Sequence, residues 1–273
     1  MRRTYEIHDL QPYINWAYFY YAWQLHDPVQ QQKSRAEAED ILRQLDGEYH
    51  VYALFDLFTA YSYNDDIVIT IPSPLSPLHL PMLRQQHGDC LCLADFISPQ
   101  NNTLHSPLST LHSKIGVFAT SVDHGLETDF DHDAYMKMMV QLLADRLAEA
   151  AAEKLHEEVR KEVWGYAPDE HLTMEELHAE KFQGIRPAVG YPSLPDTSLN
   201  FVLDKLLEFR QIGIRLTEHG AMKPHASVSG LMIALPAAHY FSIGKIGEDQ
   251  LHDYARRRGL PVETLRKYLL SNL

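Results

Sequence analysis

A single apolar stripe between Asp131 and Trp164 limits what this chain can fold into more than any other feature of its sequence. Apolar residues recur there every three or four positions, which is the spacing of one helix face over about nine turns. The stripe consists of Met136, Met139, Leu143, Leu147, Ala151, Leu155, Val159 and Val163. A helix of this length extends across a small domain, so we expect a spine helix around 131–164.

The rest of the chain alternates between strand-like and helix-like patterns. β-branched and aromatic runs predict strands over 49–63, 67–71, 91–97, 115–120, 215–218, 228–235 and 240–246. Helical spacing predicts a buried, aromatic N-terminal helix and helices over 34–45, 199–210, 247–259 and 261–270. A Pro-rich loop over 72–81 is expected inside the domain, because proline cannot donate to a β ladder. With no internal repeat evident, we expect one α+β domain over residues 1–273.

Charge and composition exclude several classes of protein. The chain carries 37 acidic against 24 basic residues, a formal charge of −13, so we expect no nucleic-acid partner. No apolar run approaches the roughly 18 residues of a membrane span, and two cysteines cannot form a disulfide framework. We therefore expect a cytoplasmic protein without a membrane partner. The basic run Arg256–Arg258 is expected to be the solvated face of a C-terminal helix.

Several catalytic motifs are absent from the sequence. It contains no G-x-G-x-x-G, Walker loop, G-x-S-x-G or H-E-x-x-H. Asp123–His124 with Asp131–Asp133 is the one cluster with metal-binding side chains, but acidic residues also suit the start of a helix. We expect no metal site there, and we assign no catalytic residue.

The segment Gly184–Pro192, with the sequence GIRPAVGYP, carries the most specific chemistry. Pro187 makes the backbone of Arg186 extended, and Gly190 permits close approach of the backbone to a ligand. A stiff loop that presents one Arg and one Tyr suits the bidentate capture of a carboxylate. A plain structural turn is the alternative interpretation.

Read with other segments, this loop resembles the activation domain of cobalamin-dependent methionine synthase. The matching segments are Tyr13–Trp16, Cys92–Phe96, Leu143–Ala150, Val163–Pro168, Ala226–Gly230 and Asp253–Arg257, so the resemblance covers nearly the whole chain. It implies a single curved, helmet-like α+β domain with a mostly antiparallel central sheet. It also implies that the domain binds S-adenosylmethionine (AdoMet) and supports reductive methylation of cob(II)alamin to methylcobalamin.

The resemblance implies partners as well. Cobalamin would be carried by the cobalamin-binding module of methionine synthase, and flavodoxin or an equivalent reductase would supply an electron. Modules for homocysteine, folate and cobalamin are missing from this sequence, so we expect it to act in trans. Asp169-Glu170-His171 begins like the D-x-H-x-x-G element of corrinoid carriers, but Met174 occupies the glycine position. The chain is therefore not expected to hold the corrinoid itself.

Site residues follow from the resemblance position by position. Arg186 matches the arginine that holds the AdoMet carboxylate, and Tyr191 matches the tyrosine that faces the corrin. Tyr240 matches the first of two adjacent tyrosines that contact AdoMet, and Phe241 replaces the second.

Four further positions complete the expected cofactor site. Ala188 and Gly190 match loop positions that lie against the ligand, and Glu149 matches an acidic residue near the amino group or sulfonium. Asn15 stands where the family carries aspartate, and an amide cannot neutralise an ammonium. Two alternatives therefore remain: a module that caps a corrinoid protein but no longer binds AdoMet, and an independent hydrolase or metal enzyme built on the histidines.

Overall fold

The fold is built on a curved antiparallel sheet. The computed structural model describes residues 1–71, 77–100 and 113–273. Its main strands are β1 (Arg2–Tyr5), β2 (Val51–Tyr63), β3 (Asp66–Thr70), β4 (Leu78–Pro81), β5 (Lys114–Val122) and β8 (Ser227–Met232). The order is β4-β3-β2-β5-β8, with β1 beside the first part of β2, and every pairing is antiparallel. The predicted α+β class with a curved, mostly antiparallel sheet is thus confirmed.

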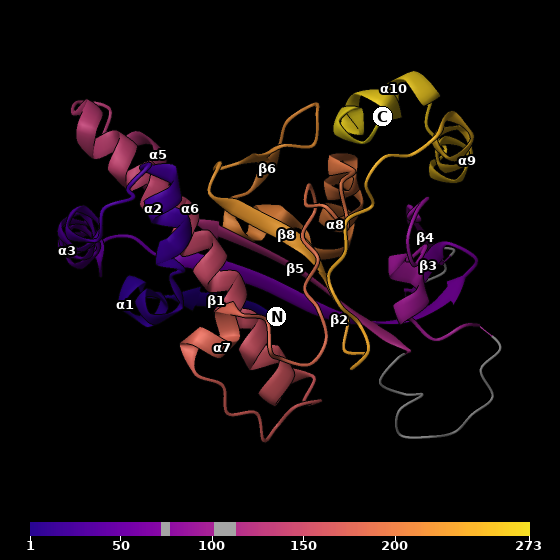
Figure 1. Cartoon of the computed structure of the whole chain (residues 1–273), viewed down its shortest axis with the longest axis horizontal. Coiled ribbons are helices and arrows are strands. Elements are labelled where there is room, and N and C mark those ends of the chain that lie inside the picture. The colour runs from indigo at the N-terminus through magenta and orange to yellow at the C-terminus, as the bar shows by residue number, and fades with distance from the viewer. Residues whose placement is uncertain (72–76, 101–112) are drawn as a thin grey trace.

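The long helix crosses this sheet (Figure 1). Helix α6 spans Ala134–Glu158 and continues into one π-helical turn, Val159–Val163. It begins later than predicted because the Asp133 side chain accepts hydrogen bonds from the backbone N–H groups of Tyr135 and Met136, which makes Asp133 the N-cap. The predicted spine helix is confirmed.

Shorter helices complete the fold. They are α1 (Ile7–Leu10), α2 (Trp16–Ala22), α3 (Pro28–Leu45), α5 (Gly125–Thr128), α7 (Met174–His178), α8 (Asn200–Leu207), α9 (Glu248–Arg258) and α10 (Val262–Tyr268). A small hairpin joins β6 (Arg215–Leu216) to β7 (Met222–Lys223). The expected N-terminal helix is divided into α1, a 3-10 turn at Gln11–Tyr13 and α2, and its aromatic residues are not all buried, since Tyr21 is 83% exposed. None of the described helices has the length and apolar character needed to cross a membrane.

The two faces of the sheet carry different cores. On one face Phe55 and Phe118 pack with α6 and with the helices α1 and α3. On the other face Leu54 and Val117 pack with α8. Alternate residues of β2 and β5 thus serve opposite cores, as the two-residue period of a strand requires.

A third core, formed by α9 and α10, lies at one end of the molecule. The expectation that Arg256–Arg258 is a solvated face is wrong for two of the three residues. Arg256 is 77% exposed, but Arg257 (14%) pairs with Asp66 and Arg258 (6%) pairs with Asp196. These two arginines attach α9 to the sheet and to the segment before α8.

Three local predictions are corrected. Residues 91–97 contain a 3-10 helix, Leu93–Phe96, instead of a strand, because Asp95 caps it by accepting from Cys92 N–H and is held by Arg84. Residues 240–246 form no strand. The end of the expected 72–81 loop is strand β4, while Pro72 and Pro74 lie outside the described residues.

Candidate functional site

The Gly184–Pro192 loop is attached to the free edge of β8. Ile185 and Ile233 exchange two backbone hydrogen bonds of 2.9 Å, and Leu231 N–H donates to Pro187 O at 3.0 Å. Gly230 makes this close approach possible, because a Cβ there would lie 2.2 Å from Pro187 O. The loop therefore acts as an additional edge segment of the sheet, which fixes the position of the Arg186 side chain.

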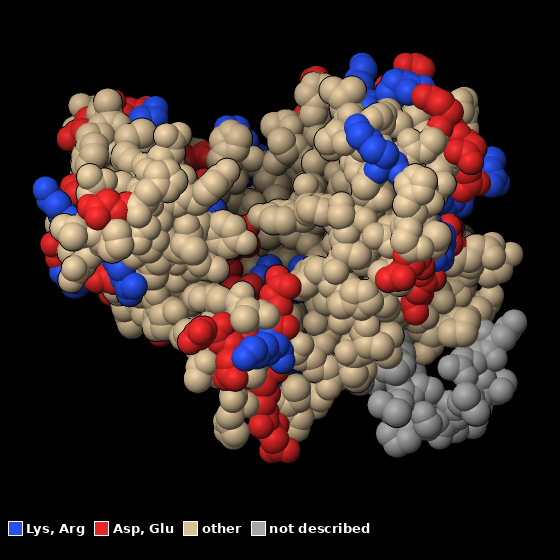
Figure 2. Space-filling model, viewed as in Figure 1, with Lys and Arg blue, Asp and Glu red and all other residues tan. Residues whose placement is uncertain are grey.

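A cavity of about 540 Å³ lies between this loop and α6. Figure 2 shows this face of the molecule hollowed between the side built by α2 and α6 and the side built by α9 and α10. Seven of the eight predicted cofactor residues line the cavity: Asn15, Glu149, Arg186, Ala188, Tyr191, Tyr240 and Phe241.

The eighth predicted residue, Gly190, lies outside the cavity lining. It is exposed and has φ +89°, a conformation that glycine adopts without strain. Its N–H donates to Leu194 O at 2.8 Å and so closes a turn. Gly190 therefore shapes the turn that presents Tyr191, and the expected approach of its backbone to a ligand stays a prediction.

Arg186 is held from three sides. Its backbone N–H donates to Tyr240 Oη at 2.8 Å, its guanidinium lies 5.6 Å from the Phe118 ring centroid, and its Nη2 donates to Glu153 Oε1. The residue is only 8% exposed. Burial alone would lower the pKa of Arg186, but Glu153, Tyr240 and Glu149 together more than offset burial and raise it, so the guanidinium stays charged.

Carboxylates outnumber guanidinium groups around the cavity. Glu149, Glu153 and Glu180 line it together with Arg146 and Arg186, which gives a net charge of −1 with histidine counted as neutral. Burial, together with the charge of Glu153, raises the pKa of Glu180. Such a lining favours a ligand that carries at least one net positive charge.

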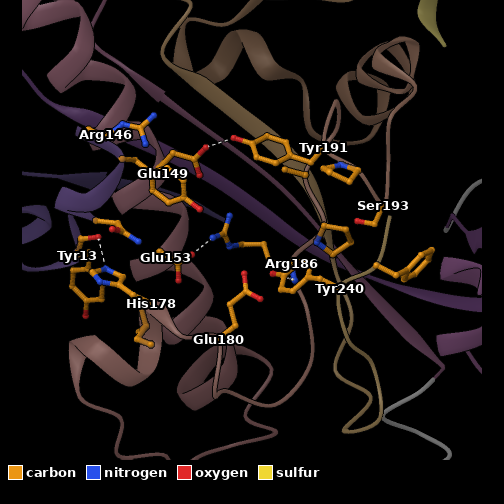
Figure 3. A pocket seen from close by; sticks show the side chains of 17 residues that line it. Tyr13, Arg146, Glu149, Glu153, His178, Glu180, Arg186, Tyr191, Ser193 and Tyr240 are labelled. Atoms are coloured by element: carbon orange, nitrogen blue, oxygen red, sulfur yellow. Dashed lines mark hydrogen bonds and ion pairs between the residues drawn. The ribbon is translucent and has the colours of Figure 1, made fainter. Parts of the chain in front are cut away.

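Tyr191 forms one wall of the site. Its hydroxyl donates to Glu149 Oε1, and Figure 3 shows the two side chains reaching toward one another from the loop and from α6. Partial burial and the negative charge of Glu149 raise the pKa of Tyr191, so the phenol stays protonated and keeps donating.

Sequence reasoning missed several lining residues. Arg146 and Glu153 stand three residues before and four residues after Glu149, so the three share one face of α6, a signal that helical spacing alone contains. Glu180 lies just after α7 with φ +57°, a strained backbone for a non-glycine residue, and nothing in the sequence indicates it. His178 also lines the cavity and approaches Tyr13 O at 3.1 Å through Nε2.

Asn15 has a structural role besides lining the cavity. It is the N-cap of α2, and its Oδ1 accepts from Ala17 N–H at 3.1 Å. Among the described residues, Asp123–His124 and Asp131–Asp133 included, no group of three or more His, Cys, Asp or Glu side chains is placed so that it could hold a metal ion.

Comparison with known proteins places this geometry in a family. The family model described as the vitamin B12-dependent methionine synthase activation domain matches residues 6–259. A crystal structure of the MetH reactivation domain bound to AdoHcy is 38% identical in sequence, with a TM-score of 0.89, and the match covers 100% of this chain and 90% of that one. The protein described here therefore belongs to the family of activation domains of vitamin B12-dependent methionine synthase.

Proposed function

We propose that the cavity binds AdoMet and that the domain serves the reactivation of a cobalamin-dependent methionine synthase. The observation that carries this proposal is the buried, charged Arg186 on a loop fixed to the sheet edge, because a guanidinium in that position offers an anchor for a ligand carboxylate. The AdoHcy bound by the similar MetH domain is AdoMet without its methyl group, which supports the same ligand class.

The charges of the cavity suit AdoMet. At neutral pH the molecule carries a carboxylate, an ammonium and a sulfonium, so its net charge of +1 complements the −1 of the lining. Tyr191, Tyr240 and Phe241 add aromatic surface that attracts a sulfonium by cation–π interaction, worth about 0.5–2 kcal/mol. The domain itself would supply no nucleophile; it would orient the methyl group and exclude water.

Two exposed tyrosine rings that line the cavity offer a surface for a flat apolar group. Tyr18 is 60% exposed and Tyr191 is 49% exposed, and both line the cavity. A corrin carried by a cobalamin-binding module could lie against these rings, and cobalamin bound in this way would supply the metal that accepts the methyl group. We propose that the domain acts together with this module and with flavodoxin or an equivalent reductase.

A second function is favoured by two contacts. Asn15 Oδ1 is already engaged by Ala17 N–H, and Arg186 is already paired with Glu153. A domain in which these groups never release would cap a corrinoid protein without binding AdoMet.

Calorimetric titration of AdoMet separates the two functions. We expect micromolar binding that Arg186→Ala weakens by roughly ten- to a hundred-fold, the value of a charge-assisted hydrogen bond. Arg43→Ala removes an exposed arginine of α3 and is the matched control with unchanged binding. Absence of AdoMet binding, both alone and with the cobalamin-binding module present, would support the capping function instead.

A further inference from the structure

The ion pair between Arg186 and Glu153 is only half made. Arg186 Nη2 donates to Glu153 Oε1, but Arg186 Nε and Glu153 Oε2 have no hydrogen-bond partner within the described part of the chain, although both atoms are buried. Figure 3 shows this contact between α6 and the loop, beside the hydrogen bond from Tyr191 to Glu149. One donor and one acceptor therefore remain unmatched in the wall of the cavity.

A pair of the same type in which the whole carboxylate is used exists elsewhere in the molecule, although Arg160 Nη1 is itself buried without a hydrogen-bond partner among the described residues. Arg160 donates from Nε at 3.0 Å and from Nη2 at 2.6 Å to the carboxylate of Glu170, so both carboxylate oxygens are used. Arg160, at 0% exposed, is also the more deeply buried of the two arginines. The contrast indicates that the Arg186 pair is not optimised as a permanent structural contact.

The surrounding charges leave Glu153 free to change partner. Glu149 is engaged by the Tyr191 hydroxyl, and Glu180, just after α7, lies close enough to Arg186 for the two charges to interact (Figure 3). Arg186 therefore keeps a carboxylate nearby even when Glu153 moves away. An unmatched buried donor and acceptor are costly, so a ligand that satisfies both would be favoured.

We infer that Glu153 is a specificity-determining residue that occupies the place of the ligand carboxylate on Arg186 and exchanges to the ligand ammonium on binding. This inference rests on the proposed function. The α-amino acid end of AdoMet carries both groups: its carboxylate would replace Glu153 on Arg186, and its ammonium would take the released Glu153 carboxylate. A ligand with only the carboxylate must displace Glu153 without giving it a new partner.

The exchange predicts opposite effects of one substitution on two ligands. In Glu153→Gln the Kd of AdoMet should rise roughly ten-fold, because the ammonium loses a charged acceptor. The Kd of the AdoMet analogue in which hydrogen replaces the α-ammonium should fall roughly three-fold or more, because a neutral amide competes less for Arg186. Glu39→Gln removes one charge from a pair on α3 and is the control that should change neither value.

The other outcomes each overturn the inference. Weaker binding of both ligands by Glu153→Gln would mean that Glu153 only supports Arg186. Tighter binding of both would mean that Glu153 only competes with the ligand carboxylate for Arg186. Two unchanged Kd values would mean that Glu153 has no role in ligand binding. Glu153→Asp keeps the charge and should restore the preference for AdoMet, which guards against a folding defect in the amide variant. A wild-type protein that binds neither ligand would refute the proposed function itself, which is a different result from any of these.

Discussion

Gly230→Ala tests whether the site depends on the close approach of the loop to β8. The added Cβ would lie 2.2 Å from Pro187 O and 2.8 Å from Ala188 Cα, so it meets backbone that cannot rotate away. The loop must then move outward by about 1 Å to regain normal contact. This shift would weaken the hydrogen bonds on either side, Leu231 N–H to Pro187 O at 3.0 Å and Val189 N–H to Ser229 O at 2.9 Å.

The cost of this change can be set from those contacts. Overpacking costs about 1–3 kcal/mol, and each weakened backbone hydrogen bond adds up to about 1 kcal/mol. We expect a total loss of about 2–4 kcal/mol in the free energy of unfolding, which corresponds to a fall in Tm of roughly 5–15 °C for a chain of this size. Because the loop carries Arg186, AdoMet affinity should fall at least ten-fold as well.

Differential scanning calorimetry and AdoMet titration measure the two effects. Gly116→Ala is the matched control, since its Cβ would meet side-chain atoms, Phe55 Cε2 at 2.6 Å and Met232 Cβ at 3.0 Å, and not the loop. We expect it to lower Tm while leaving AdoMet binding intact. The reasoning fails if Gly230→Ala keeps both its Tm and its affinity, or if the two variants lose affinity equally.

Two further predictions concern Asn15 and His156. Asn15→Ala should lower the free energy of unfolding by about 1 kcal/mol, measured by urea unfolding, because the α2 N-cap is lost. Asn15→Asp should keep the cap and tighten AdoMet binding roughly five-fold or more, measured by calorimetry. An Asp variant without tighter binding would place the ligand ammonium elsewhere. Burial, and then the charges of Arg160 and Arg186, hold the pKa of His156 well below 6.5 in the folded state, so its stabilising contribution is complete above pH 6.5 and is lost as the pH falls. The unfolding free energy of the wild type should decline between pH 7 and 5, and His156→Asn should reduce this decline by up to about 1.4 kcal/mol per pH unit. The control His252→Asn, at an exposed position, should leave the decline unchanged. Equal slopes of unfolding free energy against pH for wild type and His156→Asn would contradict this account.

Local periodicity predicted the elements whose partners are close in sequence or whose stripe is long. The spine helix and the strands β2, β3 and β5 were found because burial on one face imposes a period of 3.6 or 2 on the sequence. The run 91–97 has strand-like composition, but Asp95 is held by Arg84 and folds it into a 3-10 turn. That contact depends on tertiary structure, which a local pattern does not contain.

The prediction of a strand over 240–246 was wrong for a related reason. A strand there needs a free sheet edge, and the edge of β8 is already occupied by residues 185–189 of the site loop. Tyr240 instead accepts the Arg186 N–H at 2.8 Å and so ties the segment to that loop. Which of two apolar segments pairs with an edge is decided by packing, and the sequence shows only that both could.

The site divides in the same way between residues that the sequence indicates and residues that only the fold brings together. Arg186 and Tyr191 belong to one short loop, so their proximity follows from the sequence itself. Glu153 meets Arg186 across 33 positions of sequence, and Glu180 reaches the cavity from a left-handed residue after α7. No local spacing connects these groups, and the charge of the cavity depends on them.

The long helix explains why this site has a fixed charge pattern at all. Leu143, Leu147 and Ala151 are buried against the sheet, and this burial fixes the rotation of α6 about its axis. Glu149 and Glu153 are four residues apart on the adjoining face, so the same rotation directs both toward the loop. A shorter helix would have less apolar surface to resist rotation, and the carboxylates would be positioned less strictly. The apolar stripe that limits the fold therefore also sets the orientation of the acidic residues, so substitutions in the stripe should disturb ligand selectivity before they unfold the domain.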